Sequence, residues 1–273
     1  MLEAIVYRLR AKNTARIPLV HGRLMHAAFF SLLQEFNPEL SAEIHDLQTQ
    51  KPFTISELQK IRKSSRMGHT SPSLKITENT LLDWRVTAWD RRIIDCLQSL
   101  RPGFSFRIGS LELEVTDCAM SPAQHPDSGL LRREDLVAGC RFVPKIREIT
   151  FSFLSPVSFR FFDRDYPWPL PEYVFGSLAD KWSIGNPPFP IDRSDLREIA
   201  RSLSPCRWHG QSRTVYFKAD RGTLGFVGEF SYSVAHLPPE EQRLLLLLSK
   251  FAVFSGVGRL TGHGLGQVRT RYC

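Results

Sequence analysis

The sequence predicts an α+β protein in which two halves repeat one order of strands and helices. Three observations lead to this prediction: strand-like and helix-like segments alternate along the 273 residues, their order occurs twice, and a glycine-rich loop precedes the last strand. Hydrophobic residues make up 42% of the chain, which is typical of a globular protein. The length suits two ordinary domains, each with its own core, and we place them at residues 1–143 and 144–273.

The first half is expected to run strand, helix, strand, strand, helix, strand. Residues 2–10 alternate apolar and polar side chains, as a half-buried strand does. Pro18 stands where a helix over 19–36 begins, and Asn37 is placed to cap a second, short helix. The other elements expected in this half are strands at 53–56, 75–77 and 80–89, a helix capped by Asp90 that runs to Leu100, and one or two strands within 106–120.

The second half is expected to repeat this order after a connection. Residues 118–142 contain two prolines, two glycines and several charges, so we interpret them as that connection. The elements expected after it are strands within 146–162, a helix over 169–183, a proline-rich linker, a hairpin of 214–218 and 223–234, a helix over 238–254 and a last strand. Twice over, this is the split β-α-β order of the ferredoxin-like fold, which the common RNA-recognition module (RRM) shares. That fold hosts many functions, so the function has to be argued from particular residues.

The glycine-rich loop near the end of the chain has five glycines within eleven residues. Glycine adopts backbone angles that other residues avoid, and it lets a phosphate come close to main-chain N–H groups. Arg259, Arg269 and Arg271 flank the glycines, and no acidic residue follows Glu241. A leucine-rich segment before the loop and an alternating segment after it indicate an ordered element, suited to hold a polyanion, and not a flexible tail.

Charge and composition narrow the class of partner and the setting. The formal net charge of +8 and the pI near 9.4 favour an anionic partner, nucleic acid first and a membrane surface second. The most apolar run, 244–254, is interrupted by Lys250 and is well short of the roughly 20 residues of a membrane span. Five scattered cysteines without a Cys-x-x-Cys pair indicate neither a zinc site nor a disulfide framework. The chain opens on a strand pattern and not on a signal segment, so a reduced cytoplasm is the expected setting.

Two stretches of the sequence resemble a known family. The pattern Gly-x-Gly-x-x-x-Gly-x-Gly-x-Gly, after a helix in the second half, is similar to that of the repeat-associated mysterious proteins (RAMPs) of CRISPR systems. A stretch of the first half, carried by residues 22–30, 37–40, 44–46 and 51–56, resembles the endoribonucleases of that superfamily, which cut the precursor CRISPR transcript within each repeat. The resemblance implies that the chain binds CRISPR repeat RNA, both precursor and product, without a cofactor. It leaves open whether the chain acts as a monomer or a homodimer, and whether it joins other subunits of a CRISPR interference complex.

The resemblance also implies a metal-independent reaction. The 2′-hydroxyl of RNA attacks the neighbouring phosphate and leaves a 2′,3′-cyclic phosphate and a free 5′-hydroxyl, so that mature guide RNAs are produced. Such cleavage needs a base, an acid and positive charge on the phosphorane, and histidine serves as either proton carrier near neutral pH. Some relatives pair a histidine and a lysine, six residues apart, with a tyrosine on the preceding helix. His45 and Lys51 match that spacing.

This sequence departs from the family pattern at Phe30, where those relatives have the tyrosine and phenylalanine has no proton to offer. His26 lies four residues earlier, on the same face of the expected helix, and can supply the missing acid or base. Arg23 lies three residues before His26 and is suited to brace a phosphate. The predicted catalytic residues are therefore His45, His26, Lys51 and Arg23, with no metal, and which histidine is the base stays open. His21, at the start of the helix, is a weaker candidate and is expected to be exposed.

The expected RNA-binding residues lie in two loops. They are Gly256, Gly258, Arg259, Gly262, His263, Gly264, Gly266, Gln267 and Arg269 in the glycine-rich loop, and Arg62 and Lys63 in a basic loop of the first half. Arg91 and Arg92 open a helix, where cations oppose the helix dipole, which is a weak sign of a phosphate partner. The aromatic group within 159–168 either stacks on unpaired bases or belongs to the core.

Two other functions fit parts of the sequence. A non-catalytic RNA-binding subunit of a CRISPR interference complex keeps the glycine-rich loop and needs no histidine. A nucleotide-binding site is disfavoured, because the loop lacks the Gly-Lys-Ser/Thr ending of a P-loop and precedes a strand, whereas the dinucleotide-binding motif precedes a helix.

Overall fold

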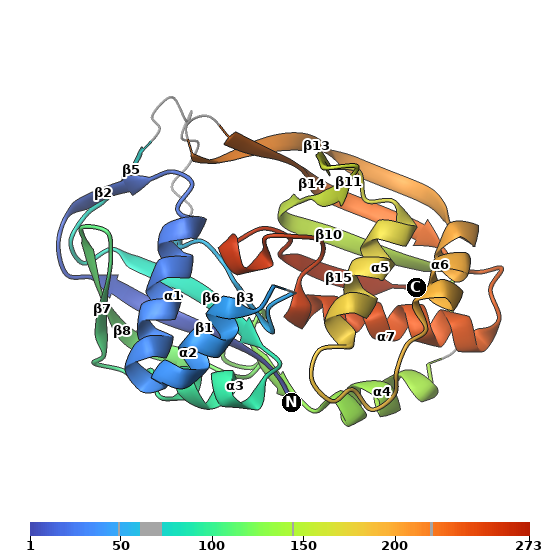
Figure 1. Cartoon of the computed structure of the whole chain (residues 1–273), viewed down its shortest axis with the longest axis horizontal. Coiled ribbons are helices and arrows are strands. Elements are labelled where there is room, and N and C mark those ends of the chain that lie inside the picture. The colour runs from blue at the N-terminus through green and yellow to red at the C-terminus, as the bar shows by residue number, and fades with distance from the viewer. Residues whose placement is uncertain (49, 61–72, 144, 219–220) are drawn as a thin grey trace. The chain divides into compact units, whose positions relative to one another are not determined.

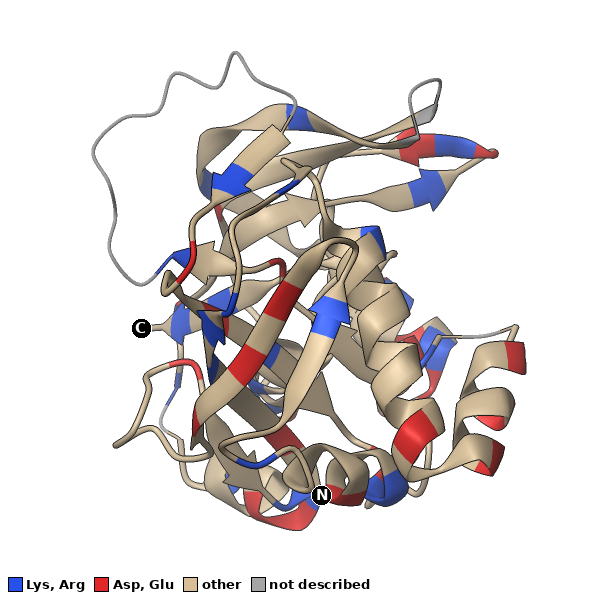
Figure 2. Cartoon of the chain, turned by 90° about the vertical axis from the view of Figure 1, so that its left-hand side faces the viewer, with Lys and Arg blue, Asp and Glu red and all other residues tan. Residues whose placement is uncertain are grey.

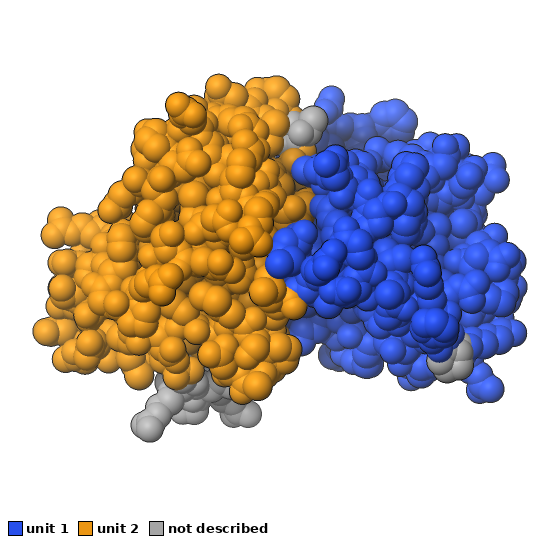
Figure 3. All heavy atoms as spheres, turned by 90° about the horizontal axis from the view of Figure 1, so that it is seen from below, with its two compact units in different colours: residues 1–2, 131–273 blue, residues 3–130 orange. Residues whose placement is uncertain are grey.

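The computed structural model of the chain describes residues 1–48, 50–60, 73–143, 145–218 and 221–273. These residues form two compact units, which are residues 3–130 and residues 131–273 together with residues 1–2 (Figure 3). We call them the N-terminal and the C-terminal unit. Within the described residues, no helix is both long enough and apolar enough to cross a membrane.

The N-terminal unit is built on an antiparallel sheet with the strand order β3-β6-β1-β8-β7 (Figure 1). Its strands are β1 (Leu2–Ala11), β3 (Phe53–Ile55), β6 (Leu81–Ala88), β7 (Ser105–Ile108) and β8 (Leu111–Ala119). Strands β1, β3, β6 and β8 occur in the chain in the order 1, 2, 3, 4 and lie in the sheet in the order 2-3-1-4, which is the ferredoxin-like arrangement. Short strands β4 (Gln59–Lys60) and β9 (Gly129–Leu131) follow β3 and β8 in the chain, and β2 (Ala15–Pro18) pairs with β5 (Ser73–Ile76).

The helices of this unit cover one face of the sheet and enclose its core. They are α1 (Gly22–Phe36), α2 (Pro38–Asp46) and α3 (Arg91–Gln98). The predicted caps are confirmed: the Asn37 side chain accepts a hydrogen bond from the backbone N–H of Leu40 (3.0 Å), and Asp90 accepts one from Arg92 (2.9 Å). Buried Tyr7 on β1 donates its hydroxyl to the carbonyl of Leu97 (2.8 Å), which fixes α3 on the sheet.

The basic residues that open α3 have carboxylate partners, so they do not indicate a phosphate site as the sequence suggested. Arg92 donates two hydrogen bonds to Glu43 on α2 (2.7 and 2.8 Å), and Arg91 pairs with Asp95 (2.8 Å). Acidic and basic positions also lie side by side on the hairpin β7–β8, where Arg107 faces Glu112 (Figure 2). These surface charges neutralise one another within the unit.

The C-terminal unit repeats the ferredoxin-like arrangement in a second antiparallel sheet with the order β13-β14-β10-β15. Its strands are β10 (Glu148–Val157), β13 (Ser204–Lys218), β14 (Arg221–Ser233) and β15 (Val268–Tyr272), and a separate hairpin joins β11 (Phe159–Phe161) to β12 (Arg164–Tyr166). Its helices are α4 (Arg133–Arg141), α5 (Pro171–Trp182), α6 (Arg193–Ser202) and α7 (Pro239–Ser255), with a short 3-10 helix at Thr261–His263.

The structure corrects three predictions in this part of the chain. The expected connection 118–142 contains helix α4, and the expected proline-rich linker contains helix α6, which Asp192 caps. Strand β13 begins at Ser204, ten residues before the predicted hairpin strand at 214. The sequence did not reveal this early part of the strand, because residues 204–214 are exposed and show no apolar alternation. Helix α4 contacts α7, and the C-terminal unit begins at Leu131. The domain boundary between residues 143 and 144 stays a prediction from the sequence. The other predicted helices and strands are confirmed within a few residues of their expected bounds.

Candidate active site and glycine loop

Three of the four predicted catalytic side chains gather around the ring of Phe30 on α1. The His26 ring lies 4.8 Å from that of Phe30, centroid to centroid, and the His45 ring lies 5.5 Å from it in an edge-to-face arrangement. The Lys51 ammonium lies 5.7 Å from the same centroid. Phe30 itself packs on buried Phe53 at 5.9 Å, so its ring is a fixed centre for the cluster. We call His26, Phe30, His45 and Lys51 the Phe30 cluster.

The elements that carry the Phe30 cluster explain how it forms. His26 and Phe30 are four residues apart on α1, so they share one helix face. Leu40 and Ile44 bury the inner face of α2, which turns His45 at its C-terminal end toward solvent, with 73% of its side chain exposed. His26 is half-buried and stacks on Phe53 at 6.1 Å. One imidazole is therefore held by aromatic packing and the other is accessible.

Lys51 acts in the structure as a cap for the C-terminus of α2. Its ammonium donates to the backbone carbonyls of Ile44 and His45, the latter at 2.9 Å, and lies 3.4 Å from that of Leu47. These are carbonyls that a helix end leaves without partners, and a cation there also interacts favourably with the helix dipole. Partial burial lowers the pKa of Lys51. Lys51 thus fixes the helix end on which His45 is mounted.

Arg23 lies exposed on α1, one turn before His26, without a hydrogen bond or ion pair to any described residue. Its guanidinium is therefore available to an anion from solvent. His21, in contrast, is buried, which corrects our expectation that it is exposed. Its Nδ1 donates to the carbonyl of Leu19 (3.1 Å), and its Nε2 accepts from the backbone N–H of Leu58 (2.8 Å). Both ring nitrogens are used in holding the segment before α1, so His21 is a structural residue.

The glycine loop, residues 256–267, is ordered, as the sequence predicted. Gly256, Gly258, Gly264 and Gly266 have positive φ angles of 63°, 73°, 91° and 66°. A Cβ at Gly258 would lie 2.5 Å from the carbonyl oxygen of Ser158, and one at Gly266 would lie 2.0 Å from that of Val257. Both contacts are closer than any side chain tolerates, so these glycines let the loop close on itself and on the segment before β11.

The main-chain N–H groups of the loop are largely used within the unit. Those of Val257 and Gly266 donate to the carbonyls of Gly266 and Pro156 (both 2.9 Å), and that of Arg259 donates to Ser158 (3.0 Å). The N–H of Gly258 donates to the hydroxyl of Ser177 (3.0 Å). The sequence argument that glycines offer their N–H groups to a phosphate therefore does not hold at these positions.

A buried lysine that sequence reasoning missed holds the loop from beneath. Lys181 on α5 is fully buried, and its ammonium donates to the carbonyls of Gly256 (3.1 Å) and Gly258 (2.9 Å). Burial lowers the pKa of Lys181 to about 7, and the nearby charge of Asp180 opposes that shift only in part. The sequence gives no signal for this contact, since lysine near the end of an amphipathic helix is usually a solvated charge.

The partly exposed side chains of the loop are the ones that can meet a ligand. Arg259 forms an ion pair with Asp165 on β12, and the His263 ring lies 5.8 Å from that of Phe217. Arg269 is exposed at the start of β15, whereas Gln267 is buried. Gly262 is partly exposed, and Gly256, Gly258, Gly264 and Gly266 are buried. Arg62 and Lys63 lie outside the described residues.

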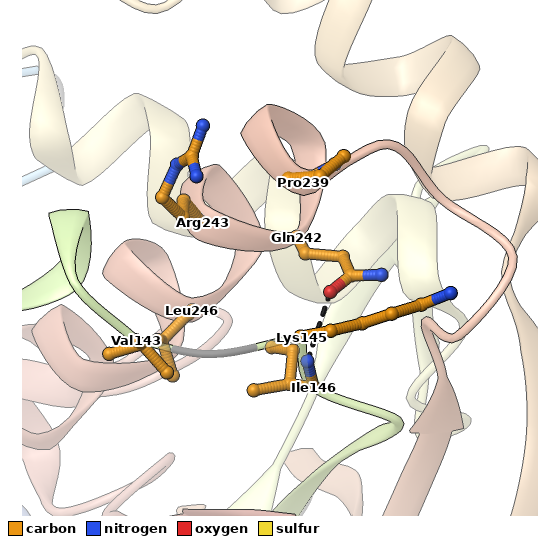
Figure 4. A pocket seen from close by; sticks show the side chains of 7 residues that line it. All are labelled: Val143, Lys145, Ile146, Pro239, Gln242, Arg243 and Leu246. Carbon is orange, nitrogen blue, oxygen red and sulfur yellow. Dashed lines mark hydrogen bonds between the residues drawn. The ribbon is translucent and has the colours of Figure 1, made fainter.

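A separate hollow in the C-terminal unit lies between α7 and the segment before β10 (Figure 4). Gln242 crosses it and accepts a hydrogen bond from the N–H of Ile146 (3.0 Å), while its amide donates to the carbonyls of Val234 and Leu237. The hollow contains no predicted site residue, and Gln242 serves to join α7 to the sheet. Among the residues that the structure describes, no three His, Cys, Asp or Glu side chains are grouped so as to hold a metal ion.

Comparison with known proteins agrees with this arrangement. The model of the CRISPR Cas6 N-terminal domain matches residues 1–134, and the model of the CRISPR-associated endoribonuclease Cas6 matches residues 151–268. The chain belongs to the Cas6 family. This confirms the RAMP-superfamily resemblance drawn from the two sequence stretches. The α+β fold with two tandem ferredoxin-like domains is likewise confirmed.

The similar Cas6 proteins include solved structures that match over the whole chain. Thermus thermophilus Cas6 (TTHB231) is 27% identical with a TM-score of 0.73, covering 99% of this chain and 98% of that chain. A product complex of Cas6 (TTHB231) is 27% identical with a TM-score of 0.78, covering 99% and 100%. A Cas6 (TTHA0078) product complex is 25% identical with a TM-score of 0.75, covering 99% of each. The CRISPR-associated endoribonuclease Cas6 of Mycobacterium tuberculosis is 27% identical over 172 residues, which are 62% of this chain and 51% of that protein. The match therefore spans about half the length of that curated relative.

Proposed function

We propose that this protein is a metal-independent endoribonuclease that cuts precursor CRISPR RNA within its repeats and so produces mature guide RNAs. The observation that carries the proposal is the Phe30 cluster, in which two imidazoles and a helix-capping ammonium surround one aromatic ring. Membership of the Cas6 family, and the product complexes solved for similar Cas6 proteins, supply the substrate class. The repeat RNA is the partner before and after cleavage.

The proposed reaction divides the proton transfers between the two imidazoles. One imidazole removes the proton of the 2′-hydroxyl, and the 2′-oxygen attacks the adjacent phosphorus. The bond from phosphorus to the 5′-oxygen then breaks, and the other imidazole, in its protonated form, gives that oxygen a proton. The products are a 2′,3′-cyclic phosphate and a 5′-hydroxyl.

The surrounding residues fit the remaining requirements of this reaction. Arg23 projects from α1 one turn before His26 and carries an unpaired positive charge for the phosphorane. Lys51 holds the C-terminus of α2, and with it the position of His45, through the carbonyls that its ammonium contacts. We assign Lys51 to positioning and not to proton transfer, because its donors already point at those carbonyls. Phe30 offers no proton, and we therefore assign both the acid and the base to the histidines of the cluster.

The test is a comparison of cleavage and binding in His26→Ala and His45→Ala. Each variant is expected to lower the single-turnover cleavage rate by about 10²- to 10⁴-fold in EDTA, while the Kd for repeat RNA changes little. His209→Ala, which removes an exposed histidine on β13, is the matched control and is expected to cut at the wild-type rate. If both single variants cut normally, the active site has been misplaced.

The same experiment distinguishes the proposed nuclease from a non-catalytic RNA-binding subunit. A binding subunit of an interference complex binds repeat RNA in EDTA and leaves it intact. The proposed nuclease leaves one discrete cut, and its upstream fragment ends in a cyclic phosphate that a phosphatase removes only after acid has opened the ring to a phosphate monoester. Wild-type protein that binds a repeat tightly and never cuts it would favour the binding subunit. Size-exclusion chromatography with light scattering separates monomer from homodimer.

A further inference from the structure

The hairpin β11–β12 carries an aromatic residue in a conformation that aromatic residues avoid. Phe161 pairs with Arg164, which leaves Phe162 and Asp163 as the two turn residues. Their φ angles are 43° and 60°, and two-residue hairpin turns with positive φ at both positions favour Asn-Gly. A phenylalanine here is strained, because its Cβ crowds the neighbouring carbonyl in the left-handed region.

Packing within the chain does not offset this strain. The Phe162 ring is 85% exposed and meets the ring of Phe161, itself 47% exposed, edge to face at 4.5 Å. The other aromatic residues of this segment are more buried: Phe159 is 5% exposed, and Tyr166 packs against Tyr173 at 5.4 Å. The structure thus separates the aromatic group that the sequence left undecided. Phe159 belongs to the core. Phe162 is exposed to solvent at the tip of a hairpin whose other aromatic side chains pack against the unit.

The charges beside Phe162 favour an anionic ligand with flat rings. Arg164 is exposed and has no carboxylate partner among the described residues. Arg160 is exposed on the facing strand and pairs with Asp163 at 3.4 Å. An exposed aromatic ring next to an unpaired guanidinium is the combination that binds unpaired nucleotides, because the ring stacks on a base while the cation meets the phosphate.

The base of the hairpin is joined to the glycine loop. Arg259 of the loop forms an ion pair with Asp165 on β12, and its N–H donates to the carbonyl of Ser158, just before β11. Gly258 packs on the same carbonyl. The hairpin β11–β12 and the glycine loop are therefore fixed to each other within the C-terminal unit.

We propose that Phe162 stacks on an unpaired base of the repeat RNA, beside the nucleotides that contact the glycine loop. This assignment rests on the proposed function, since it takes repeat RNA as the ligand. In this proposal the hairpin tip binds the substrate, and it takes no part in the proton transfers at the catalytic residues.

The test is Phe162→Asn, measured with a repeat RNA that wild-type protein binds and that carries a 2′-deoxy nucleotide at the cut. The Kd is expected to rise about 5- to 150-fold, the range seen when one base loses its aromatic partner. Asn tolerates positive φ, so the melting temperature is expected to stay the same or rise. A purely structural role for Phe162 predicts the opposite pair of results: a lower melting temperature and an unchanged Kd.

Two matched variants keep the result interpretable. Phe162→Trp keeps both the strain and the stacking surface, and it is expected to bind as tightly as wild type. Phe142→Asn changes a phenylalanine that is 91% exposed at the end of α4, and it is expected to leave the Kd unchanged. In addition, 2-aminopurine placed along the unpaired part of the repeat is expected to lose fluorescence at one position with wild type and to regain it with Phe162→Asn.

The outcomes separate this inference from the proposed function. Wild type and Phe162→Asn with equal Kd values overturn the stacking role, and a protein partner for the exposed ring is then the better reading, while cleavage stands. Wild-type protein that binds no repeat RNA overturns both. Phe162→Asn with a raised Kd and a normal cleavage rate at saturating protein supports the stacking role by itself.

Discussion

Replacing the buried lysine beneath the glycine loop tests how that loop is held. In Lys181→Met the side chain keeps its length and apolar stem but loses the ammonium that bonds the carbonyls of Gly256 and Gly258. Among the described residues, Lys181 has no carboxylate within hydrogen-bonding distance. Its neighbour in the chain, Asp180, pairs with Arg193 instead. Its pKa is about 7 in the folded chain, against 10.5 for an ordinary lysine. The two values predict a pH dependence of stability.

The sign and size follow from proton linkage. Below pH 7 the lysine is protonated in both states, and the folded chain carries the full cost of a buried charge. Between pH 7 and 10.5 the unfolded chain binds more protons than the folded one, so the free energy of unfolding rises with pH. From pH 7 to pH 9 this contribution amounts to about 2 kcal/mol. Lys181→Met has no proton to release, so the difference between wild type and variant changes by that amount over this range.

The assay is amide hydrogen exchange of α5 and β10 at pH 7, 8 and 9, which reports opening of the C-terminal unit by itself. Comparing wild type with the variant cancels the titration of cysteines and other groups common to both. Lys250→Met is the control for the loss of a lysine from the same unit, since the Lys250 ammonium lies over the Tyr272 ring and not on the carbonyls of the glycine loop. A wild-type-minus-variant difference that stays constant from pH 7 to 9 would refute the reasoning about Lys181.

Two further predictions concern the glycine loop and the α2 cap. Gly258→Ala is expected to lower the free energy of unfolding by at least about 2 kcal/mol, because the new Cβ lies 2.5 Å from the Ser158 carbonyl oxygen at a φ of 73°. Gly139→Ala within α4, where a Cβ meets nothing within 4 Å, is expected to raise it by up to about 1 kcal/mol, and urea unfolding measures both. Lys51→Met is expected to slow single-turnover cleavage roughly tenfold with the Kd unchanged, since α2 loses its cap but both imidazoles stay. An unchanged rate in Lys51→Met would show that His45 is held without that cap.

Local signals in the sequence account for the parts of the fold that could be predicted. The alternation of side chains in residues 2–10 marked strand β1, although nearly all of its residues are buried. Helices α2 and α3 begin at the capping side chains of Asn37 and Asp90, whose chemistry is local. Helices α4 and α6 escaped prediction because each buries a single pair of apolar residues one turn apart, Leu136 with Cys140 and Leu196 with Ala200. Two residues do not establish a helical period. The early part of β13 is exposed, so it has no alternation to read.

The candidate site could be predicted as a set of residue types but not as a geometry. The spacing of His26 and Phe30 fixes a shared helix face, and the family resemblance adds His45 and Lys51. Their convergence on the Phe30 ring depends on how α2 folds back along α1, which spacing alone does not give. The contacts of Lys51 and Lys181 with carbonyls of other segments are tertiary contacts of a residue type that is usually solvated. No local pattern in the sequence marks them.

The glycine loop shows why a composition can point to the right segment for an incomplete reason. From the sequence we expected the glycines to expose main-chain N–H groups to phosphates. In the structure the buried glycines instead allow close backbone packing, as where Gly258 lies against the carbonyl of Ser158. Because Lys181, Ser177 and Ser158 already bond the loop, its backbone is ordered before any ligand arrives. Binding to a preformed loop does not incur the entropy cost of ordering it. In the proposed complex the loop therefore contributes by holding Arg259, His263 and the attached hairpin tip in fixed positions, and the affinity for RNA comes from those side chains.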